Sequence, residues 1–69
     1  MKKYLVKVVH NVYDDYYKDA ENVYVNANNY HEALGRVCEM YPTCYRVKVE
    51  YYEKKNGGIR AVKGYKKNK

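Results

Sequence analysis

Four residue types are absent from this 69-residue chain: serine, glutamine, tryptophan and phenylalanine do not occur. Without serine there is no nucleophile for a serine-based catalytic triad. The two cysteines, Cys38 and Cys44, have no histidine placed beside them in the sequence, and a catalytic thiol needs a neighbouring base and an orienting group. We therefore expect no catalytic residues and a protein that is not an enzyme.

Long apolar runs are also missing. No stretch of 18 apolar residues occurs, so we expect no membrane-spanning segment and no membrane partner. The opening MKKYLVKVVHNVYDD has a basic start and a short apolar run that Lys7 interrupts, and no small-residue cleavage site follows. We interpret it as a strand rather than a signal peptide. A cytoplasmic location with reduced thiols is then expected, while a Cys38–Cys44 disulfide remains the alternative.

Potential metal ligands are few and poorly spaced. His10, His31 and the two cysteines lack the paired close spacing of a structural zinc site. The three aspartates within residues 13–21 have neither the ligand spacing nor the turn glycine of a calcium loop. We expect no metal and no cofactor, and we interpret residues 13–21 as a mobile, solvated acidic loop.

Tyrosine and positive charge are the two excesses. Tyrosine occurs eleven times, and the formal net charge is +6. Residues 1–42 carry five Lys and Arg against six Asp and Glu, whereas residues 43–69 carry nine against two. A charge distribution this uneven creates a local field that attracts polyanions. The basic end therefore points to binding of a negatively charged partner.

Apolar and polar residues alternate in four segments, which predicts four strands. The first two cover residues 3–12 and 22–27. Residues 44–54 alternate longest, and they place Tyr45, Val47, Val49 and Tyr51 on the inner face and Arg46, Lys48, Glu50 and Tyr52 on the outer face. Asn56 and Gly57 then favour a two-residue hairpin turn. This turn pairs Glu53 with Arg60, Tyr51 with Val62 and Glu50 with Lys63.

A helix is predicted between the second and third strands. Asn29 has the capping-box spacing to Glu32, and Pro42 ends the helix. Apolar residues between them recur at helical spacing and form one stripe: Tyr30, Ala33, Leu34, Val37, Cys38 and Tyr41.

This order of elements predicts a single ββαββ domain over residues 1–65, with a frayed basic tail at 66–69. The fold class is α+β: one four-stranded antiparallel sheet in the order 2-1-3-4, with the helix on one face. We expect a core formed by Val6, Val8, Val23, Val25, Leu34, Val37, Val47, Val49 and Val62.

One helix covers only one face of such a sheet, so the other face is left for solvent or a partner. Cationic side chains neutralise phosphates and aromatic rings stack on bases. Tyrosine and arginine also anchor protein interfaces. The binding residues that we expect on this face and on the basic hairpin are Lys3, Lys7, Tyr24, Arg46, Lys48, Tyr52, Arg60, Lys63 and Tyr65.

The layout resembles that of small phage-encoded accessory proteins, some anti-CRISPR proteins among them. The resemblance is carried by the MKKYLVKVV strand, the VYVNANNYHEAL junction and the basic terminal hairpin. It is architectural and transfers no functional residue. It implies an inhibitor in the host cytoplasm that sterically blocks a nucleic-acid-handling complex, for example a CRISPR effector.

Two functions follow as hypotheses. In the first, the protein inhibits a host protein or protein–nucleic-acid complex through a basic, tyrosine-rich surface. In the second, the open face of the sheet binds nucleic acid directly. A direct binder shifts single-stranded nucleic acid by itself with a strong salt dependence, whereas an inhibitor co-purifies with its target.

Overall fold

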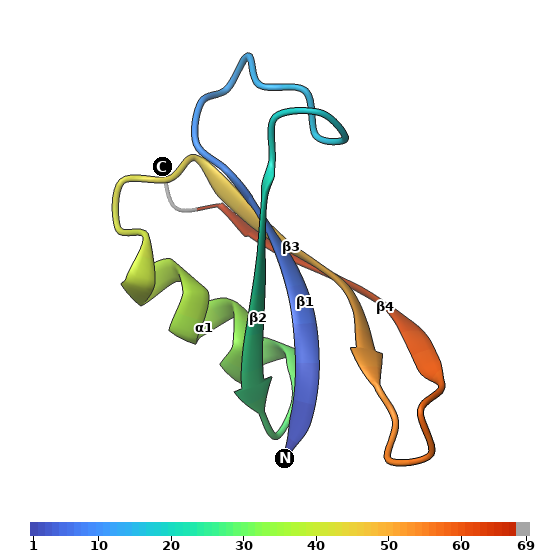
Figure 1. The fold of residues 1–69 in the computed structure, drawn as a ribbon. Helices are drawn as coiled ribbons and strands as arrows, with labels where there is room; N and C mark the ends of the chain where they lie inside the picture. Colours follow the sequence, from blue (N-terminus) through green and yellow to red (C-terminus); the bar gives the residue numbers. More distant parts are fainter. Residues whose placement is uncertain (68–69) are drawn as a thin grey trace.

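The chain forms a four-stranded antiparallel sheet with one helix packed on one face, an α+β fold of ββαββ order (Figure 1). This computed structural model describes residues 1–67. The strands are β1 (Lys2–Val9), β2 (Glu21–Ala27), β3 (Arg46–Glu53) and β4 (Ile59–Lys67), and the helix is α1 (Tyr30–Met40). The order across the sheet is β2-β1-β3-β4, which confirms the predicted fold class and topology.

The core lies between α1 and the sheet. Successive residues of a strand point to opposite faces, so the alternating valines of β1 and β3 all reach the helix side. Seven of the expected core residues are buried, and the other two, Val25 and Val62, are partly buried and pack against them. The seven are Val6, Val8, Val23, Leu34, Val37, Val47 and Val49.

Both ends of α1 follow the sequence signals. The Asn29 side chain accepts a hydrogen bond from the Glu32 backbone N–H at 2.9 Å, so the predicted cap is formed. The helix ends at Met40, two residues before Pro42. No helix among the described residues has the length and apolar run that crossing a membrane requires.

The first strand is shorter than predicted. It ends at Val9 rather than at residue 12, and the side chain of Val12 is exposed. The Asp14 carboxylate accepts a hydrogen bond from the Asn11 backbone N–H at 3.1 Å, and the Asp14 N–H binds the Asn11 carbonyl at 3.0 Å. This local turn takes the chain out of the sheet before a longer strand can form.

The hairpin turn is one residue longer than predicted. Lys54 N–H binds the Gly58 carbonyl at 2.7 Å, which leaves three residues, Lys55 to Gly57, in the turn. Gly57 has φ +88°, the backbone region that glycine reaches without steric cost. The longer turn shifts the adjacent pairing by one residue.

The pairs next to the turn are therefore Glu53 with Ile59, Tyr52 with Arg60 and Tyr51 with Ala61. The predicted Glu53–Arg60, Tyr51–Val62 and Glu50–Lys63 pairs are wrong. Further along the hairpin the predicted register holds from Val49, opposite Gly64, to Arg46, opposite Lys67. The last strand thus includes two residues of the expected frayed tail, and residues 68–69 of that tail lie outside the described residues.

A β-bulge at Glu50 exchanges the faces of two tyrosines. Val6 pairs with Val49 and its neighbour Leu5 pairs with Tyr51, so Glu50 is an extra residue in β3. Beyond the bulge, Tyr52 lies on the helix side, and its ring centre is 5.4 Å from that of Tyr4. Tyr51 lies on the open face, so the predicted orientations of Tyr51 and Tyr52 are wrong.

Candidate functional site: the open face of the sheet

The face of the sheet opposite α1 carries rows of side chains that the strand pairing brings into line. The middle row runs from Asn22 through Lys7 and Lys48 to Tyr65. Toward the β3–β4 turn, the next row contains Tyr24, Leu5, Tyr51 and Ala61. Toward the other end, Arg46 lies between Val9 and Lys67. Cations and tyrosines are thus neighbours across all four strands.

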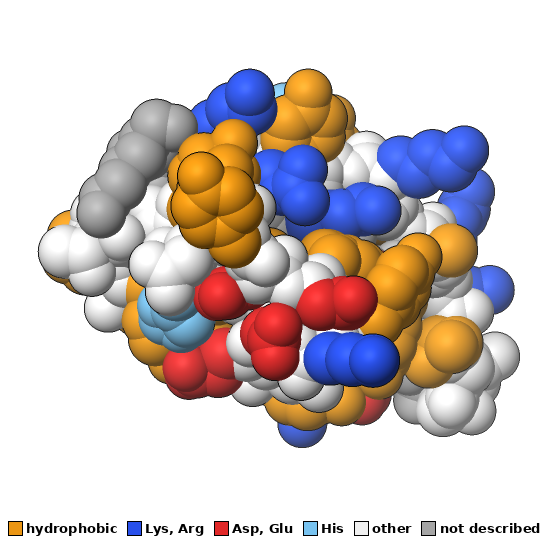
Figure 2. Space-filling model, turned by 90° about the horizontal axis from the view of Figure 1, so that it is seen from above, with side chains coloured by type: hydrophobic (Ala, Val, Ile, Leu, Met, Phe, Trp, Pro, Cys, Tyr) orange, Lys and Arg blue, Asp and Glu red, His pale blue; other side chains and the backbone are white. Residues whose placement is uncertain are grey.

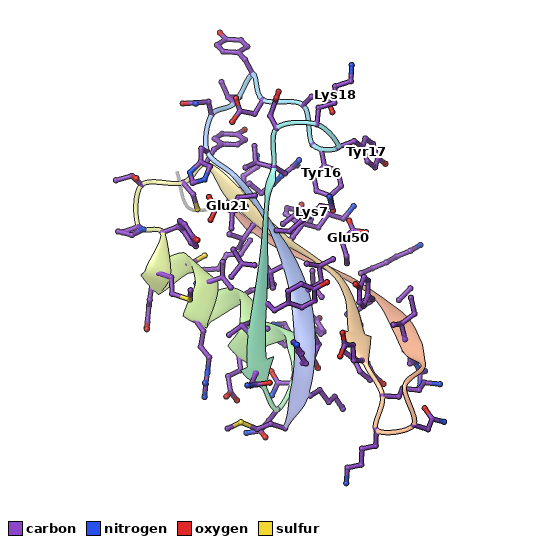
Figure 3. All side chains as sticks on the ribbon, in the orientation of Figure 1. Lys7, Tyr16, Tyr17, Lys18, Glu21 and Glu50 are labelled. Atoms are coloured by element: carbon purple, nitrogen blue, oxygen red, sulfur yellow. The ribbon has the colours of Figure 1, made fainter. Side chains whose placement is uncertain are left out.

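Lys7 and Lys48 are the central feature of this face because they are direct cross-strand partners. Like charges opposite each other oppose sheet formation, by roughly 0.2–1 kcal/mol. The ring of Tyr16 lies over both: its centre is 5.4 Å from the Lys7 Nζ and 4.9 Å from the Lys48 Nζ. The negative face of an aromatic ring attracts ammonium groups and offsets part of this repulsion. Figure 3 shows Tyr16 descending from its loop beside Lys7, away from α1.

Tyr16 reaches this place because the loop between β1 and β2 is folded by its own aspartates. The Asp15 carboxylate accepts hydrogen bonds from the backbone N–H groups of Tyr17 at 2.8 Å and Lys18 at 3.0 Å. The Asp19 carboxylate accepts one from the Asp15 N–H at 2.9 Å. We expected a mobile acidic loop here. Asp15 and Asp19 are exposed, as in a solvated loop, and their hydrogen bonds also stabilise a series of turns that hold Tyr16 over the sheet.

This loop, together with the tyrosine side chains, makes the open face less open than the sequence predicts. Leu5 is 8% exposed and Val9 is 3% exposed, although both point away from α1. Two polar atoms at this face, the Tyr16 hydroxyl and the Arg46 Nε, are buried and have no hydrogen-bond partner among the described residues. Buried polar atoms are normally paired, so these two unpaired atoms cost the folded state free energy.

Two further tyrosines continue the face toward β2. The hydroxyl groups of Tyr24 and Tyr51 form a hydrogen bond at 3.2 Å, and the Lys3 Nζ lies 5.0 Å from the centre of the Tyr24 ring. The hydrogen bond to Tyr24 is the main cause of the raised pKa of Tyr51. Tyr24 is 50% exposed and Tyr65 is 63% exposed, so both present ring surface to solvent.

Seven of the nine expected binding residues share the open face: Lys3, Lys7, Tyr24, Arg46, Lys48, Lys63 and Tyr65. Tyr52 and Arg60 do not. The bulge at Glu50 turns Tyr52 to the helix side, and Arg60 is its partner across the hairpin. Tyr16 and Tyr51 take part in the site but were not among the expected residues. The sequence signal for Tyr16 was the aspartate-rich turn pattern that precedes and follows it.

Within residues 1–67, the cations of the open face form no ion pair. Within residues 1–67, the ion pairs formed are Arg36–Glu32 at 2.7 Å on α1 and His10–Glu21 at 3.2 Å at the start of β2. Figure 2 shows the loop end of the molecule with acidic side chains in its middle and lower part and most Lys and Arg side chains in its upper part. Lys3 lies opposite Glu53 in the sheet, whereas Lys7, Lys48 and Arg46 lie opposite no acidic residue in the strand pairing of residues 1–67.

Both cysteines belong to the core between α1 and the sheet. Burial raises the pKa of the Cys38 thiol, and Cys44 is fully buried. No disulfide joins the two cysteines. Among residues 1–67 no three His, Cys, Asp or Glu side chains are grouped as metal ligands. Comparisons with protein-family models, with curated proteins and with solved structures gave no match.

Proposed function

We propose that this protein is a non-enzymatic binding protein whose open sheet face binds single-stranded nucleic acid. The observation that carries the proposal is the cross-strand pair Lys7–Lys48 under the ring of Tyr16, on a face whose cations form no ion pair within residues 1–67. A phosphate placed here relieves the repulsion between two ammonium groups and releases counterions from its own strand.

The tyrosines account for the choice of a single strand. Unpaired bases expose their faces, and stacking on an aromatic side chain contributes roughly 1–3 kcal/mol per base. Tyr24 and Tyr65 lie on either side of the lysine pair, on the outer strands β2 and β4, and keep much of their surface exposed. A duplex offers its phosphates but not its base faces, so it gains only the electrostatic part.

A second function, the inhibition of a nucleic-acid-handling host complex, is favoured by the tip of the β1–β2 loop. Tyr13 is 96% exposed and Tyr17 is 84% exposed, and Val12 beside them is also exposed. Exposed tyrosines on a hydrogen-bonded loop are the type of residue that anchors protein interfaces. In this version, a phage-type inhibitor in the host cytoplasm docks on its target through the loop and blocks the nucleic-acid path with its basic face.

Fluorescence anisotropy with labelled 12-nucleotide single strands of DNA and RNA tests the first function. We expect an affinity for the single strands that falls steeply with salt. A duplex of equal length should bind more weakly. In the variant Tyr24→Leu/Tyr65→Leu, the affinities for single strand and duplex should become equal. The matched control is Tyr13→Leu/Tyr17→Leu, which changes two exposed tyrosines of the loop. Equal affinity for single strand, duplex and heparin would show that only bulk charge is sensed and would refute the proposal.

The same two double variants separate the two functions. Affinity purification of the tagged protein from host lysate, with and without nuclease, is the measurement. The inhibitor function predicts a nuclease-resistant protein partner that Tyr13→Leu/Tyr17→Leu no longer captures. The nucleic-acid function predicts that captured proteins disappear after nuclease treatment.

A further inference from the structure

A hollow of about 430 Å³ lies at the exposed edge of the sheet, where β4 passes the first turns of α1. Residues from the helix side and from the open face line it together. They are Tyr30, His31 and Leu34 of α1, Lys48 of β3, and Lys63, Gly64 and Tyr65 of β4. The hollow therefore continues the basic face around the edge strand, and four of its seven residues are not part of the site described above.

Tyr30 is a fixed wall of this hollow. It packs against the core, and its ring centre is 4.1 Å from that of His31, with the two rings inclined by 31°. Gly64 allows the Tyr30 ring to lie directly on the backbone of β4. A Cβ at Gly64 would be 2.6 Å from the Tyr30 Cδ2 and 2.8 Å from its Cε2, far closer than atoms in contact. The glycine thus determines the position of the ring.

The chemistry of the lining selects the ligand. Two tyrosine rings and Leu34 offer surface to a flat, mostly apolar group, while Lys48 and Lys63 add two positive charges. Ligand pockets usually measure about 300–1,000 Å³, so this one is of a size for a single small molecule rather than a chain. A nucleotide has both features, a flat base and a negatively charged phosphate, so the lining fits one nucleotide.

We propose that this hollow binds one nucleotide unit, with the base against Tyr30 and Tyr65 and the phosphate at Lys48 and Lys63. The proposal rests on the nucleic-acid function proposed above, because it gives the strand a defined point of entry at the β4 edge. The unit is either a free nucleotide or one residue of a strand, since both present the same base and phosphate.

Titration of the labelled protein followed by NMR tests the site. The probes are adenosine monophosphate, uridine monophosphate, adenosine and inorganic phosphate. We expect both nucleotides to shift the signals of Tyr30, Leu34 and Gly64, and to bind at least tenfold more tightly than adenosine or phosphate. Tyr65→Leu lowers nucleotide affinity about fivefold or more, in line with the loss of a stacking ring. Lys63→Ala lowers it about threefold or more, whereas Lys55→Ala, in the hairpin turn, leaves it unchanged.

A 12-nucleotide single strand in the same experiment separates the two proposals. If the strand shifts the open face but neither nucleotide shifts the hollow, the nucleotide site is refuted and the nucleic-acid function stands. If the nucleotides shift the hollow and the strand does not bind, the hollow is a site for free nucleotides and strand binding is refuted. Nucleotides that bind no more tightly than phosphate also refute the site.

Discussion

The two faces of the sheet have opposite energetic roles. On the helix side, Val6, Val8, Val47 and Val49 are fully buried, and no polar or charged residue of the described part of the chain is buried among them. On the open side, Lys7 opposes Lys48, and the Arg46 Nε is buried without a hydrogen-bond partner among residues 1–67. Burial of apolar surface stabilises the fold, whereas like charges and unpaired polar atoms cost free energy.

This energetic difference suits the helix side to stabilising the fold and the open side to the binding that we propose. A domain of this size has only a few kcal/mol of net stability, so features that lower it are kept at functional sites more often than elsewhere. The helix side is explained completely by packing. The open side fits our proposal that a ligand supplies negative charge there, and substitutions on the two faces are therefore expected to have different consequences.

The largest effect is expected on the helix side, for Leu34→Ala. Leu34 is 3% exposed, and its truncation leaves a cavity between α1 and the sheet. The cost is about 2–5 kcal/mol, a large part of the total stability. Urea denaturation measures it, with Met40→Ala on the exposed side of α1 as the control. A loss below about 0.5 kcal/mol would mean that the helix does not anchor this face.

Next in size is Gly64→Ala, which changes the edge strand where Tyr30 packs. The added Cβ displaces the Tyr30 ring, and overpacking of this kind costs about 1–3 kcal/mol. Gly35→Ala on α1 is the matched control, because an added Cβ there meets no atom within 4 Å. That substitution stabilises the helix by about 0.5–1 kcal/mol. Effects of equal sign in thermal unfolding would contradict the packing that we describe.

A smaller effect is expected at the polar cluster where β2 begins. Glu21 accepts hydrogen bonds from the Tyr41 hydroxyl and from the His10 Nε2, and these bonds lower its pKa from the ordinary value of 4.5. A carboxylate with a lowered pKa stabilises the fold above that ordinary value, and the contribution is lost as the pH falls through the folded pKa. Glu21→Gln should therefore weaken the dependence of stability on pH below about 4.5.

Urea midpoints from pH 7 down to pH 3 measure that dependence. Glu39→Gln, which changes an exposed glutamate of α1, is the control and should retain the wild-type acid dependence. An unchanged acid dependence in Glu21→Gln would show that its two hydrogen bonds do not contribute to folding.

The sequence predicts the helix side of the sheet better than the open side, for a physical reason. Alternation of valines and helical periodicity report burial directly, and they identified the core, the strand order and the Asn29 cap. The bulge at Glu50 leaves only an ambiguous signal, because the adjacent Tyr51 and Tyr52 each have an apolar ring and a polar hydroxyl and suit either face. The sequence does not determine the length of the hairpin turn either, since Asn-Gly suits two-residue and three-residue turns.

The loop residue Tyr16 shows a second limit. From the sequence, Asp15 and Asp19 of the same loop are expected to be solvated acids. In the structure their carboxylates also accept hydrogen bonds from backbone N–H groups and so fold the loop. The position of Tyr16 over Lys7 and Lys48 depends on contacts between residues far apart in the chain. Local pattern predicts which side chains are basic and aromatic, but not that one ring lies over two lysines.

The substitution Lys48→Glu tests the central claim most directly, because stability and binding are expected to change independently. It replaces a like-charge pair with an opposite-charge pair to Lys7, and the contact between Lys7 and Tyr16 remains. We expect stability within about 0.5 kcal/mol of wild type or higher, and at least a tenfold loss of affinity for a 12-nucleotide single strand with a shallower salt dependence. Lys54→Glu, in the hairpin, is the charge-matched control. If Lys48→Glu binds like wild type while folded, the open face is not the binding site.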